Sequence, residues 1–252
     1  MQQSDSAMTS TNESKLAESA ARPVSGNEYV NARFFDAWKD YQQLVGSIDT
    51  YGFTSRALAG ELRGRVVDVG SGGVVNYSCE EITELVLVDI STEYLSHVVL
   101  PACAVPKTGT AVALPVDDCA HDCLLMQMLV HHLAESDYRN TRIRVQTALR
   151  EAYRVLKPGG KLVVIESGVH RCFEIAERIS FPLTLRLLNL IGHPMVLQWA
   201  PATLCSFARE AGFTNIDLSR IPRGKWMIFL GRRWPTLLVP ISPYKIVASK
   251  PA

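Results

Sequence analysis

Short apolar runs alternate with longer amphipathic stretches along the middle of this chain. The runs are rich in Val, Leu and Ile and lie at 65–69, 85–89, 107–113, 121–128 and 161–167. Runs this short and this apolar are typical of parallel strands buried under helices on both faces. The stretch 135–156 has helical periodicity, and the Pro-Gly-Gly segment at 158–160 predicts where this helix ends. The sequence therefore predicts an α/β fold built on a mostly parallel sheet with helices on both faces.

The remaining elements complete a sheet of seven strands. Between the first three strands we predict a short helix through 80–82 and a further helix capped by Ser91. After the fifth strand, the pattern predicts a helix over 201–212, a sixth strand over 213–221 and a seventh over 244–249.

The chain before the first strand changes in composition. Residues 1–26 are rich in Ser, Thr, Ala, Glu and Gln and lack the apolar stretch of a signal peptide, which predicts a flexible tail. Apolar residues then recur at threes and fours, with a second run over 55–62. This pattern predicts a helical segment over 27–63 that covers one edge of the sheet or the mouth of a ligand site. We interpret 27–252 as a single domain.

Two apolar insertions interrupt the alternation, a mostly helical one at 169–200 and another at 222–243 between strands six and seven. Such segments are typical of the walls of a pocket for an apolar ligand, of a dimer interface, or of a surface that rests on a membrane. The sequence leaves all three open, and we interpret 169–200 as a substrate cap. Neither insertion predicts a transmembrane helix, because its apolar stretch is shorter than about 18 residues and contains proline and arginine.

Charge and cysteine content narrow the class of protein. The chain has 26 Lys and Arg against 25 Asp and Glu residues and shows no basic stripe, so nothing favours a nucleic-acid partner. The six cysteines include no pair with C-x-x-C spacing. We interpret them as reduced thiols of a cytoplasmic protein, and we predict no metal site.

The first strand ends in a glycine turn and the second ends in an acid. Glycines at 70, 72 and 73 follow the first strand, where the backbone can approach a ligand without a Cβ in the way. Asp89 closes the second strand 19 residues after Gly70. This spacing suits a βαβ unit whose second strand delivers a carboxylate to the vicinal hydroxyls of a ribose.

Four segments in register resemble the class I S-adenosylmethionine-dependent methyltransferases, most of all the small-molecule branch of the ubiquinone/menaquinone type. They are 66–73 at the family's D-x-G-x-G-x-G, 88–91 at its ribose-binding acid, 113–122 at its LP…FD run, and 154–162 at its RVLKPGG-x-L segment. The resemblance covers roughly 66–167, with weaker similarity as far as 249. It implies a Rossmann-like sheet and S-adenosylmethionine as the cofactor.

The resemblance places the cofactor at the ends of strands one, two and four. Gly70 and Gly72 are expected against its amino-acid part, Asp89 on the ribose, and Gln127 near the methionine end. An apolar pair would enclose the adenine, and Asp68 would position the glycine turn. The full set that we predict is Asp68, Gly70, Ser71, Gly72, Asp89, Ile90, Leu114, Gln127 and Met128.

Methyl transfer needs alignment of the acceptor, and it needs a base only where the acceptor must lose a proton. The candidates for that base follow strands four and five and are His131, His132, Glu166 and His170. We favour His132, because a histidine often stands there in related enzymes; the alternative for His131 and His132 is helix capping or packing. The predicted acceptor contacts are Tyr29, Tyr41 and His193, with ordinary packing as the alternative for the tyrosines.

We therefore predict a methyltransferase that acts on an O, N or C atom of a small, largely apolar or aromatic metabolite, such as a quinone-like or secondary metabolite. A homodimer is compatible with the apolar insertions. Three departures from the family keep a rival open: Val74 replaces the third glycine, Thr110 stands where an acid often reads adenine, and His121 replaces an aromatic residue. The rival binds the cofactor but catalyses a cyclisation or rearrangement, or serves only as a binding protein.

Overall fold

The computed structural model describes residues 48–90, 99–191, 193–229 and 232–252. The predicted tail, most of the predicted N-terminal helical segment and Ser91 lie outside these residues. Tyr29 and Tyr41, two of the predicted acceptor contacts, also lie outside them.

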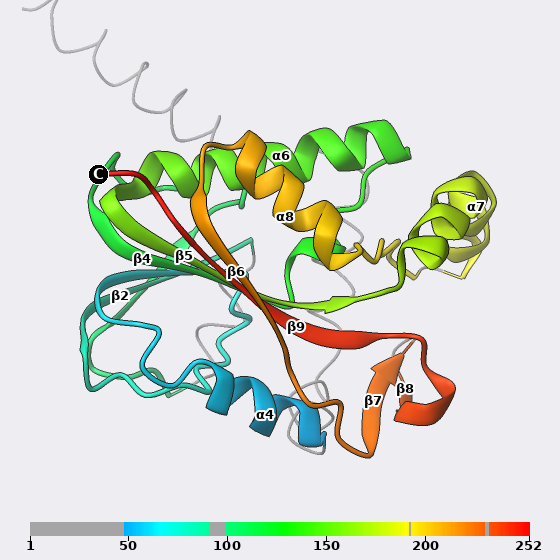
Figure 1. Ribbon diagram of the computed structural model, residues 1–252, viewed down its shortest axis with the longest axis horizontal. Coiled ribbons are helices and arrows are strands. Elements are labelled where there is room, and N and C mark those ends of the chain that lie inside the picture. Colours follow the sequence, from blue (N-terminus) through cyan, green and yellow to red (C-terminus); the bar gives the residue numbers. More distant parts are fainter. Residues whose placement is uncertain (1–47, 91–98, 192, 230–231) are drawn as a thin grey trace, which may run out of the picture.

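Seven strands form the main sheet, in the order β3-β2-β1-β4-β5-β9-β6 (Figure 1). The first five run parallel, whereas β9 is antiparallel to both of its neighbours, β5 and β6. This topology confirms the predicted mostly parallel sheet of seven strands. The strands are β1 Gly64–Val69, β2 Ile82–Asp89, β3 Ala104–Thr108, β4 His121–Gln127, β5 Leu156–Gly168, β6 Thr214–Arg220 and β9 Ser242–Ser249.

The apolar runs become central strands because alternate side chains are buried on opposite faces of the sheet. Val67 and Leu124 belong to a core cluster on one face, whereas Val66 and Leu125 belong to a second cluster on the other. All four are fully buried. The first face is covered by α6 (Tyr138–Val155) and α8 (Pro201–Glu210), and the second by α4 (Asp49–Ala57), as Figure 1 shows.

Helix α6 runs from Tyr138 to Val155, inside the stretch 135–156 that the sequence predicted. The side chain of Asp137 accepts a hydrogen bond from the backbone N–H of Asn140 at 2.8 Å and caps the helix. The helix ends at Val155, three residues before the proline of the Pro-Gly-Gly segment. Strand β5 starts at once, at Leu156, but its pairing with β4 shifts register before regular pairing resumes at Lys161. The regular part matches the strand predicted over 161–167.

Two predicted elements were wrong. No helix forms through 80–82, since Ile82 is the first residue of β2 and the preceding segment is irregular. That segment contains Val74, Val75 and Asn76, which all have low helix propensity. The third strand lies at Ala104–Thr108 rather than 107–113, because an edge strand buries little and carries little apolar pattern.

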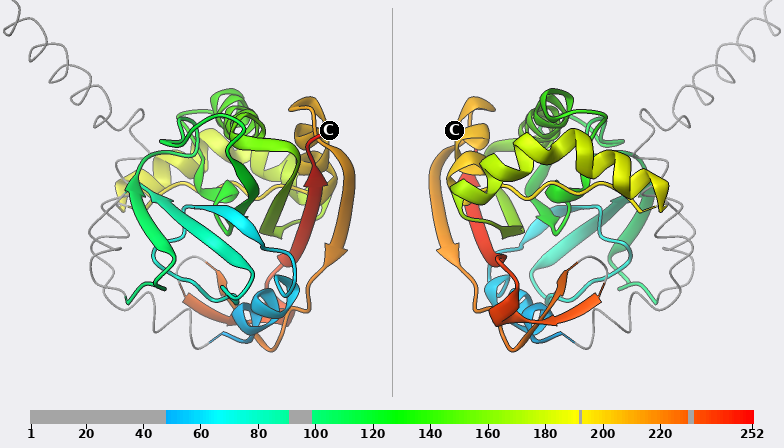
Figure 2. Two further views of the ribbon diagram at one scale, coloured as in Figure 1. Left: turned by 90° about the vertical axis from the view of Figure 1, so that its left-hand side faces the viewer. Right: turned by 90° about the vertical axis from the view of Figure 1, so that its right-hand side faces the viewer.

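The helix run predicted over 55–62 is also shifted, because α4 ends at Ala57 and the chain then turns through Gly60. A small hairpin inside the second insertion, β7 Trp226–Phe229 with β8 Arg232–Pro235, was not predicted. It is followed by the short turn η2 (Thr236–Leu238). The first insertion contains the expected helix, α7 (Arg171–Leu190). Both insertions lie at the end of the molecule where the parallel strands have their carboxyl ends (Figures 1 and 2).

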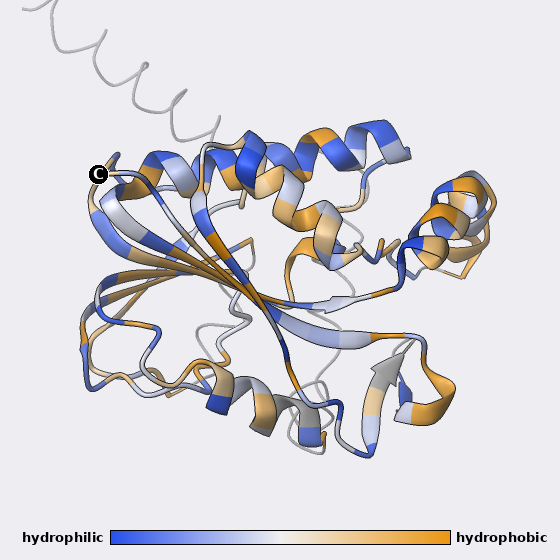
Figure 3. Cartoon of the chain, in the orientation of Figure 1, coloured by the Kyte–Doolittle hydropathy of each residue, from blue (hydrophilic) through white to orange (hydrophobic). Residues whose placement is uncertain are grey.

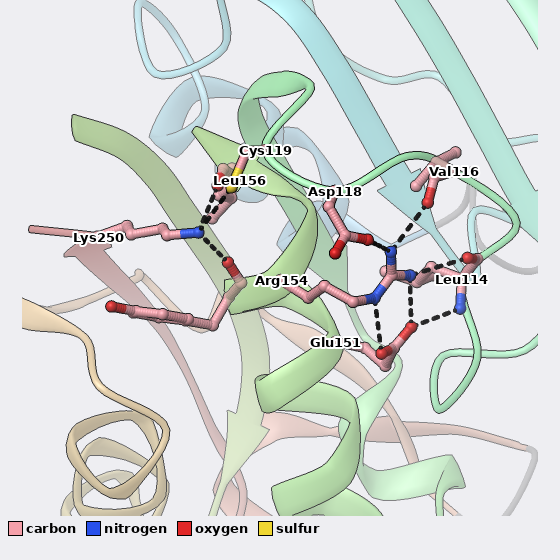
Figure 4. Close-up of polar contacts among 9 residues, drawn as sticks. Leu114, Val116, Asp118, Cys119, Glu151, Arg154, Leu156 and Lys250 are labelled. Atoms are coloured by element: carbon pink, nitrogen blue, oxygen red, sulfur yellow. Dashed lines mark hydrogen bonds and ion pairs between the residues drawn. The ribbon is translucent and has the colours of Figure 1, made fainter. Parts of the chain in front are cut away.

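Two cations fasten the end of α6 to the rest of the domain (Figure 4). The guanidinium of Arg154 donates to the carbonyl oxygens of Leu114 at 3.0 Å and Val116 at 3.1 Å, and it pairs with Glu151. The carboxylate of Glu151 in turn accepts from the backbone N–H of Leu114 at 2.9 Å. On the other side, Lys250 Nζ donates to two carbonyl oxygens at the helix end, 2.7 and 2.8 Å away. The segment around Leu114 is therefore held firmly against α6.

Candidate cofactor and acceptor site

The strand order reverses at β1, which has β2 on one side and β4 on the other. Val69, the last residue of β1, pairs with Val88 of β2 and with Met126 of β4. The residues that follow these strands therefore meet at one edge, which is where ligands bind in open α/β sheets. Gly70, Asp89 and Gln127 all lie at this edge, as the sequence predicted.

The glycine turn has the backbone that its sequence demands. Gly70, Gly72 and Gly73 have φ values of 71°, 53° and 76°, a region in which other residues are strained. A Cβ on Gly70 would lie 2.5 Å from Cδ1 of Leu129, so no side chain fits there. A Cβ on Gly72 would meet no atom within 4 Å, so the described residues leave space beside this glycine. The hydroxyl of Ser71 accepts from the N–H of Gly73 at 3.3 Å.

Asp89 joins the end of β2 to the glycine turn. Its Oδ2 atom accepts a hydrogen bond from the backbone N–H of Gly72 at 2.9 Å. The residue is half-buried and faces the turn rather than the core. The carboxylate thus lies where the two strand ends open, close to the backbone that the resemblance assigns to the cofactor.

Asp68 lies one layer deeper. It is 1% exposed, and its Oδ2 accepts from the hydroxyl of Tyr77 at 2.6 Å. Burial raises the pKa of Asp68 to about 7, with the charge of Asp89 adding to this and the Tyr77 hydrogen bond opposing it. Its position supports the predicted role of holding the glycine turn rather than contacting a ligand. Tyr77 was missed, because nothing in its local pattern marks it.

Two buried polar atoms at this edge test whether the residues fit the cofactor. Gln127 Oε1, at the end of β4, and Thr110 Oγ1, after β3, have no hydrogen-bond partner among the described residues. Buried polar atoms normally have partners, so unpartnered ones at the carboxyl ends of the strands are groups whose hydrogen bonds a ligand can complete. They stand where the resemblance places the methionine end and the adenine, and the fit is therefore good.

The other predicted cofactor residues lie close by in sequence. Ile90 is half-buried directly after Asp89, and Leu114 is buried in the core, 5% exposed. Met128 follows Gln127 with a φ of 53°, and its N–H donates to the carbonyl oxygen of Ile165 in β5. Their contacts with a bound cofactor stay a prediction.

A histidine and a buried glutamate meet at the ends of β4 and β5. His131, in the turn η1 (Val130–His132), places its Nδ1 atom 2.6 Å from Oε1 of Glu166. The Glu166 side chain is fully buried and also accepts from the backbone N–H groups of Ser167 at 2.7 Å and His131 at 3.3 Å. An ionised Glu166 can only accept, and the neutral form of His131 that pairs with it has its proton on Nδ1 and a lone pair on Nε2.

Two further histidines adjoin this pair. The His132 ring centroid is 4.1 Å from that of His131. Burial holds the pKa of His132 well below its usual value, and the charges of His131 and His193 act in the same direction. His193 is half-buried, with Nδ1 3.0 Å from the carbonyl oxygen of Pro194. The structure thus brings three of the predicted residues together with Glu166.

His170 is not part of this group. It is exposed at the start of α7, where its Nδ1 accepts from the N–H of Cys172 at 3.4 Å and caps the helix. The sequence analysis missed Glu177, whose Oε2 accepts from the N–H of Gln198 at 3.1 Å. Burial raises the pKa of Glu177 to about 7, while His131 lowers it. The sequence signal that could have identified Glu177 is the presence of two acids, Glu174 and Glu177, three residues apart in an apolar helix.

Residues 67–164 match a family model described as a methyltransferase domain. Over 129 residues the chain is 26% identical to the ubiquinone/menaquinone biosynthesis C-methyltransferase UbiE of Escherichia coli O1:K1, an alignment that covers 46% of this chain and 48% of that protein. The chain thus spans about half the length of the curated relatives it matches.

Two solved structures share the fold. One is a complex of the Haloferax volcanii Trm112 methyltransferase activator and a putative methyltransferase, with a TM-score of 0.60, 16% identity, and 86% and 98% of the two chains covered. The other is the [4+2]-cyclase SpnF, with a TM-score of 0.57, 17% identity, and coverage of 81% and 82%. Residues 67–164 therefore carry a methyltransferase domain, and the sheet order and the glycine turn beside Asp89 have the fold of the class I S-adenosylmethionine-dependent methyltransferases.

Proposed function

We propose that this chain methylates an O, N or C atom of a small, largely apolar or aromatic acceptor, and that His131 takes up the proton the acceptor loses. The observation that carries the proposal is the 2.6 Å contact between His131 Nδ1 and the buried Glu166, at the same sheet edge as Asp89 and Gly70. The cofactor would supply a methyl group bonded to a sulfonium sulfur, and the neutral thioether that leaves needs no protonation.

The residues that would hold the cofactor are those at the ends of β1, β2 and β4. Asp89 would accept hydrogen bonds from ribose hydroxyls, for which a carboxylate is the strongest neutral-pH acceptor. Gly72 leaves room beside it, and Gln127 and Thr110 each offer a buried oxygen without a partner among the described residues.

His131 suits the role of base better than His132, the residue that the sequence favoured. Glu166 holds the Nδ1 proton of His131 and would stabilise the imidazolium, which is how a carboxylate supports a histidine base. His132 has a pKa well below the usual value because it is buried beside two other histidines. With its lowered pKa and buried ring, His132 is suited to orienting His131 through packing.

The acceptor class rests on apolar composition and on one relative. The first insertion contributes buried Met195 and Leu197 beside the histidines, and the N–H of Leu197 donates to the carbonyl oxygen of His131 at 3.0 Å. The similar Escherichia coli protein is named for ubiquinone and menaquinone biosynthesis. We therefore place phenols and quinone-type rings first among the acceptors to be tested.

The experiment measures methyl transfer from S-adenosylmethionine to a panel of phenols, hydroquinones and aliphatic amines, with cofactor affinity measured in parallel by titration calorimetry. His131→Ala is expected to lower turnover about 10²- to 10⁴-fold, the usual contribution of a general base, without changing cofactor affinity. His170→Ala, in the exposed cap, serves as the matched histidine variant and is expected to change neither. Turnover that survives His131→Ala would refute the assignment of the base.

The rival function is supported by one similarity. The fold is shared with the [4+2]-cyclase SpnF, so binding of the cofactor alone does not distinguish transfer from cyclisation. Mass spectrometry of the product separates the two, since a methylated product gains the mass of one methylene unit. A product of unchanged mass would favour the cyclase reading over methyl transfer.

A further inference from the structure

Helix α7 carries an apolar stripe on the side that faces away from the domain. Its inner side is anchored by Phe181, which is 1% exposed. Ile175, Ile179, Leu183 and Leu187 follow one another at intervals of four residues, which places them along one side of the helix. Ile179 and Leu190 are 76% and 82% exposed. The stripe consists of Ile175, Ile179, Leu183, Leu187 and Leu190.

The exposed charges of α7 have one sign. Arg171, Arg178 and Arg186 are exposed, whereas both acids of the helix face the domain. Glu174 Oε2 accepts from the backbone N–H of Ala200 at 3.0 Å, and Glu177 is bonded to the 193–200 segment. The outward side of α7 is therefore apolar and cationic, and it lacks an exposed acid.

The second insertion has the same character. Residues 222–243 contain four Lys and Arg and neither Asp nor Glu. Leu237 and Leu238, in the turn η2, are 95% and 67% exposed. Arg232 and Arg233 are exposed on the adjoining strand β8. Figure 3 shows this turn as an apolar segment, and Figures 1 and 2 place it and α7 at the same end of the molecule.

A cavity of about 440 Å³ lies along the flank of α7. Arg142, Arg171 and Arg178 line it, together with Glu174 and Glu210. Arg171 makes no hydrogen bond or ion pair with any residue that the structure describes, and the guanidinium of Arg178 lies 4.9 Å from the ring centroid of Tyr138. Arg142 pairs with Glu210 at 3.8 Å, and Glu174 accepts from Ala200. Among the described residues no acid pairs with Arg171 or Arg178, so these two cations leave the flank able to accept an anionic group.

We propose that the α7 stripe and the η2 turn together form a docking surface for an anionic phospholipid bilayer. An apolar stripe flanked by arginines is the pattern of a helix that lies in a membrane interface, where apolar side chains enter the acyl boundary and cations meet phosphates. Among the described residues, no helix is long and apolar enough to cross a bilayer.

Charge distinguishes this occupant from a second copy of the chain. A two-fold contact through α7 would set Arg171, Arg178 and Arg186 against the same three arginines, with no exposed acid on the helix to pair with them. Like charges across an interface are unfavourable, whereas anionic lipid neutralises all three.

The docked end is also the end at which Gly70, Asp89 and Gln127 lie. An apolar acceptor dissolved in the bilayer would then reach the site without crossing water. This consequence rests on the proposed methyl transfer, but the docking itself does not, and the two are tested separately.

The test is sedimentation of the full chain with vesicles, since that readout needs neither cofactor nor turnover. Vesicles of phosphatidylcholine with about 30% phosphatidylglycerol are compared with phosphatidylcholine alone, and the protein is expected to bind only the anionic ones strongly. Ile179→Asp is expected to abolish binding. Arg171→Gln, Arg178→Gln and Arg186→Gln combined are expected to weaken it about 100-fold, at about fivefold for each arginine.

Ile143→Asp is the matched control, because Ile143 is an aliphatic residue 47% exposed on α6 and belongs to neither the α7 stripe nor the η2 turn. It is expected to bind vesicles as the unchanged protein does. Circular dichroism and S-adenosylhomocysteine affinity show that each variant is folded. Absent vesicle binding, equal binding after Ile179→Asp, or a dimer that Ile179→Asp dissociates would each overturn the proposal.

Discussion

The role of Asp89 can be separated into two parts by two substitutions. In the structure its Oδ2 accepts from the N–H of Gly72 at 2.9 Å, so the carboxylate already shapes the glycine turn. The proposed second role is to accept hydrogen bonds from the ribose. Asp89→Ala removes both, whereas Asp89→Asn keeps one oxygen for Gly72 but replaces the other acceptor by an NH₂ group that faces hydroxyl donors.

The magnitudes follow from the hydrogen bonds involved. A hydrogen bond to a charged group contributes about 1.5–3 kcal/mol, so loss of the ribose contacts is expected to weaken S-adenosylhomocysteine binding about 100-fold or more in both variants. The bond from the Gly72 N–H goes to the same carboxylate and contributes about 1.5 kcal/mol to folding, of which a neutral Asn acceptor keeps about 1 kcal/mol. We therefore expect Asp89→Ala to lower the free energy of unfolding by about 1.5 kcal/mol and Asp89→Asn to lower it far less.

Titration calorimetry with S-adenosylhomocysteine and urea denaturation measure the two effects. Glu84→Gln is the matched control, because Glu84 lies on the same strand but pairs with Arg65 at 2.8 Å, away from the strand's carboxyl end. Unchanged affinity in Asp89→Asn, with weakened binding in Asp89→Ala, would mean that the residue acts only through the turn. That result would contradict the ribose assignment.

Three further predictions concern the surrounding residues. Gly70→Ala forces a Cβ to within 2.5 Å of Leu129 at a φ of 71° and is expected to destabilise the fold by about 1–3 kcal/mol, measured by urea denaturation; unchanged stability would show that the turn is not so constrained. Glu166→Gln is expected to lower kcat more than it raises KM, and the reverse pattern would argue against a role beside the base. The pKa of Asp68 is raised from 3.8 to about 7 in the folded protein, so the free energy of unfolding is expected to fall as pH rises through this range. Asp68→Asn, which keeps an acceptor for Tyr77, is expected to flatten this fall in the free energy of unfolding. An equally steep fall in the variant would refute the prediction.

Those elements that bury apolar side chains on both faces were predictable from the sequence. Strands β1, β2 and β4 have unbroken apolar runs, and their bounds agree with the pattern to within a few residues. The edge strand β3 is exposed over most of its length, so its residues carry no such pattern and its position was wrong. The helix expected through 80–82 failed for a related reason, because its two glutamates suited a helix while its neighbours did not.

The site was predictable to the level of strand ends. Spacing placed Gly70, Asp89 and Gln127 at one edge, because carboxyl ends of parallel strands coincide. Sequence also placed His131, His132 and Glu166 nearby, but it did not indicate that His131, rather than the favoured His132, would pair with Glu166. Which of two adjacent side chains faces a carboxylate on the next strand depends on the φ and ψ of a short turn, and residue type alone does not fix these angles.

The resemblance to known methyltransferases rests on four segments, and their contacts explain why they occur together. Arg154 and Glu151, at the end of α6, bind the carbonyl and the N–H of Leu114, so the segment beside the predicted adenine site depends on the helix end. Asp89 binds the N–H of Gly72, so the acid of the second segment depends on the glycine turn of the first. A change in one member of either pair leaves a polar group of the other member without its hydrogen-bond partner. Each segment is therefore constrained by a partner distant in sequence, and a match at all four is far more specific than any single motif.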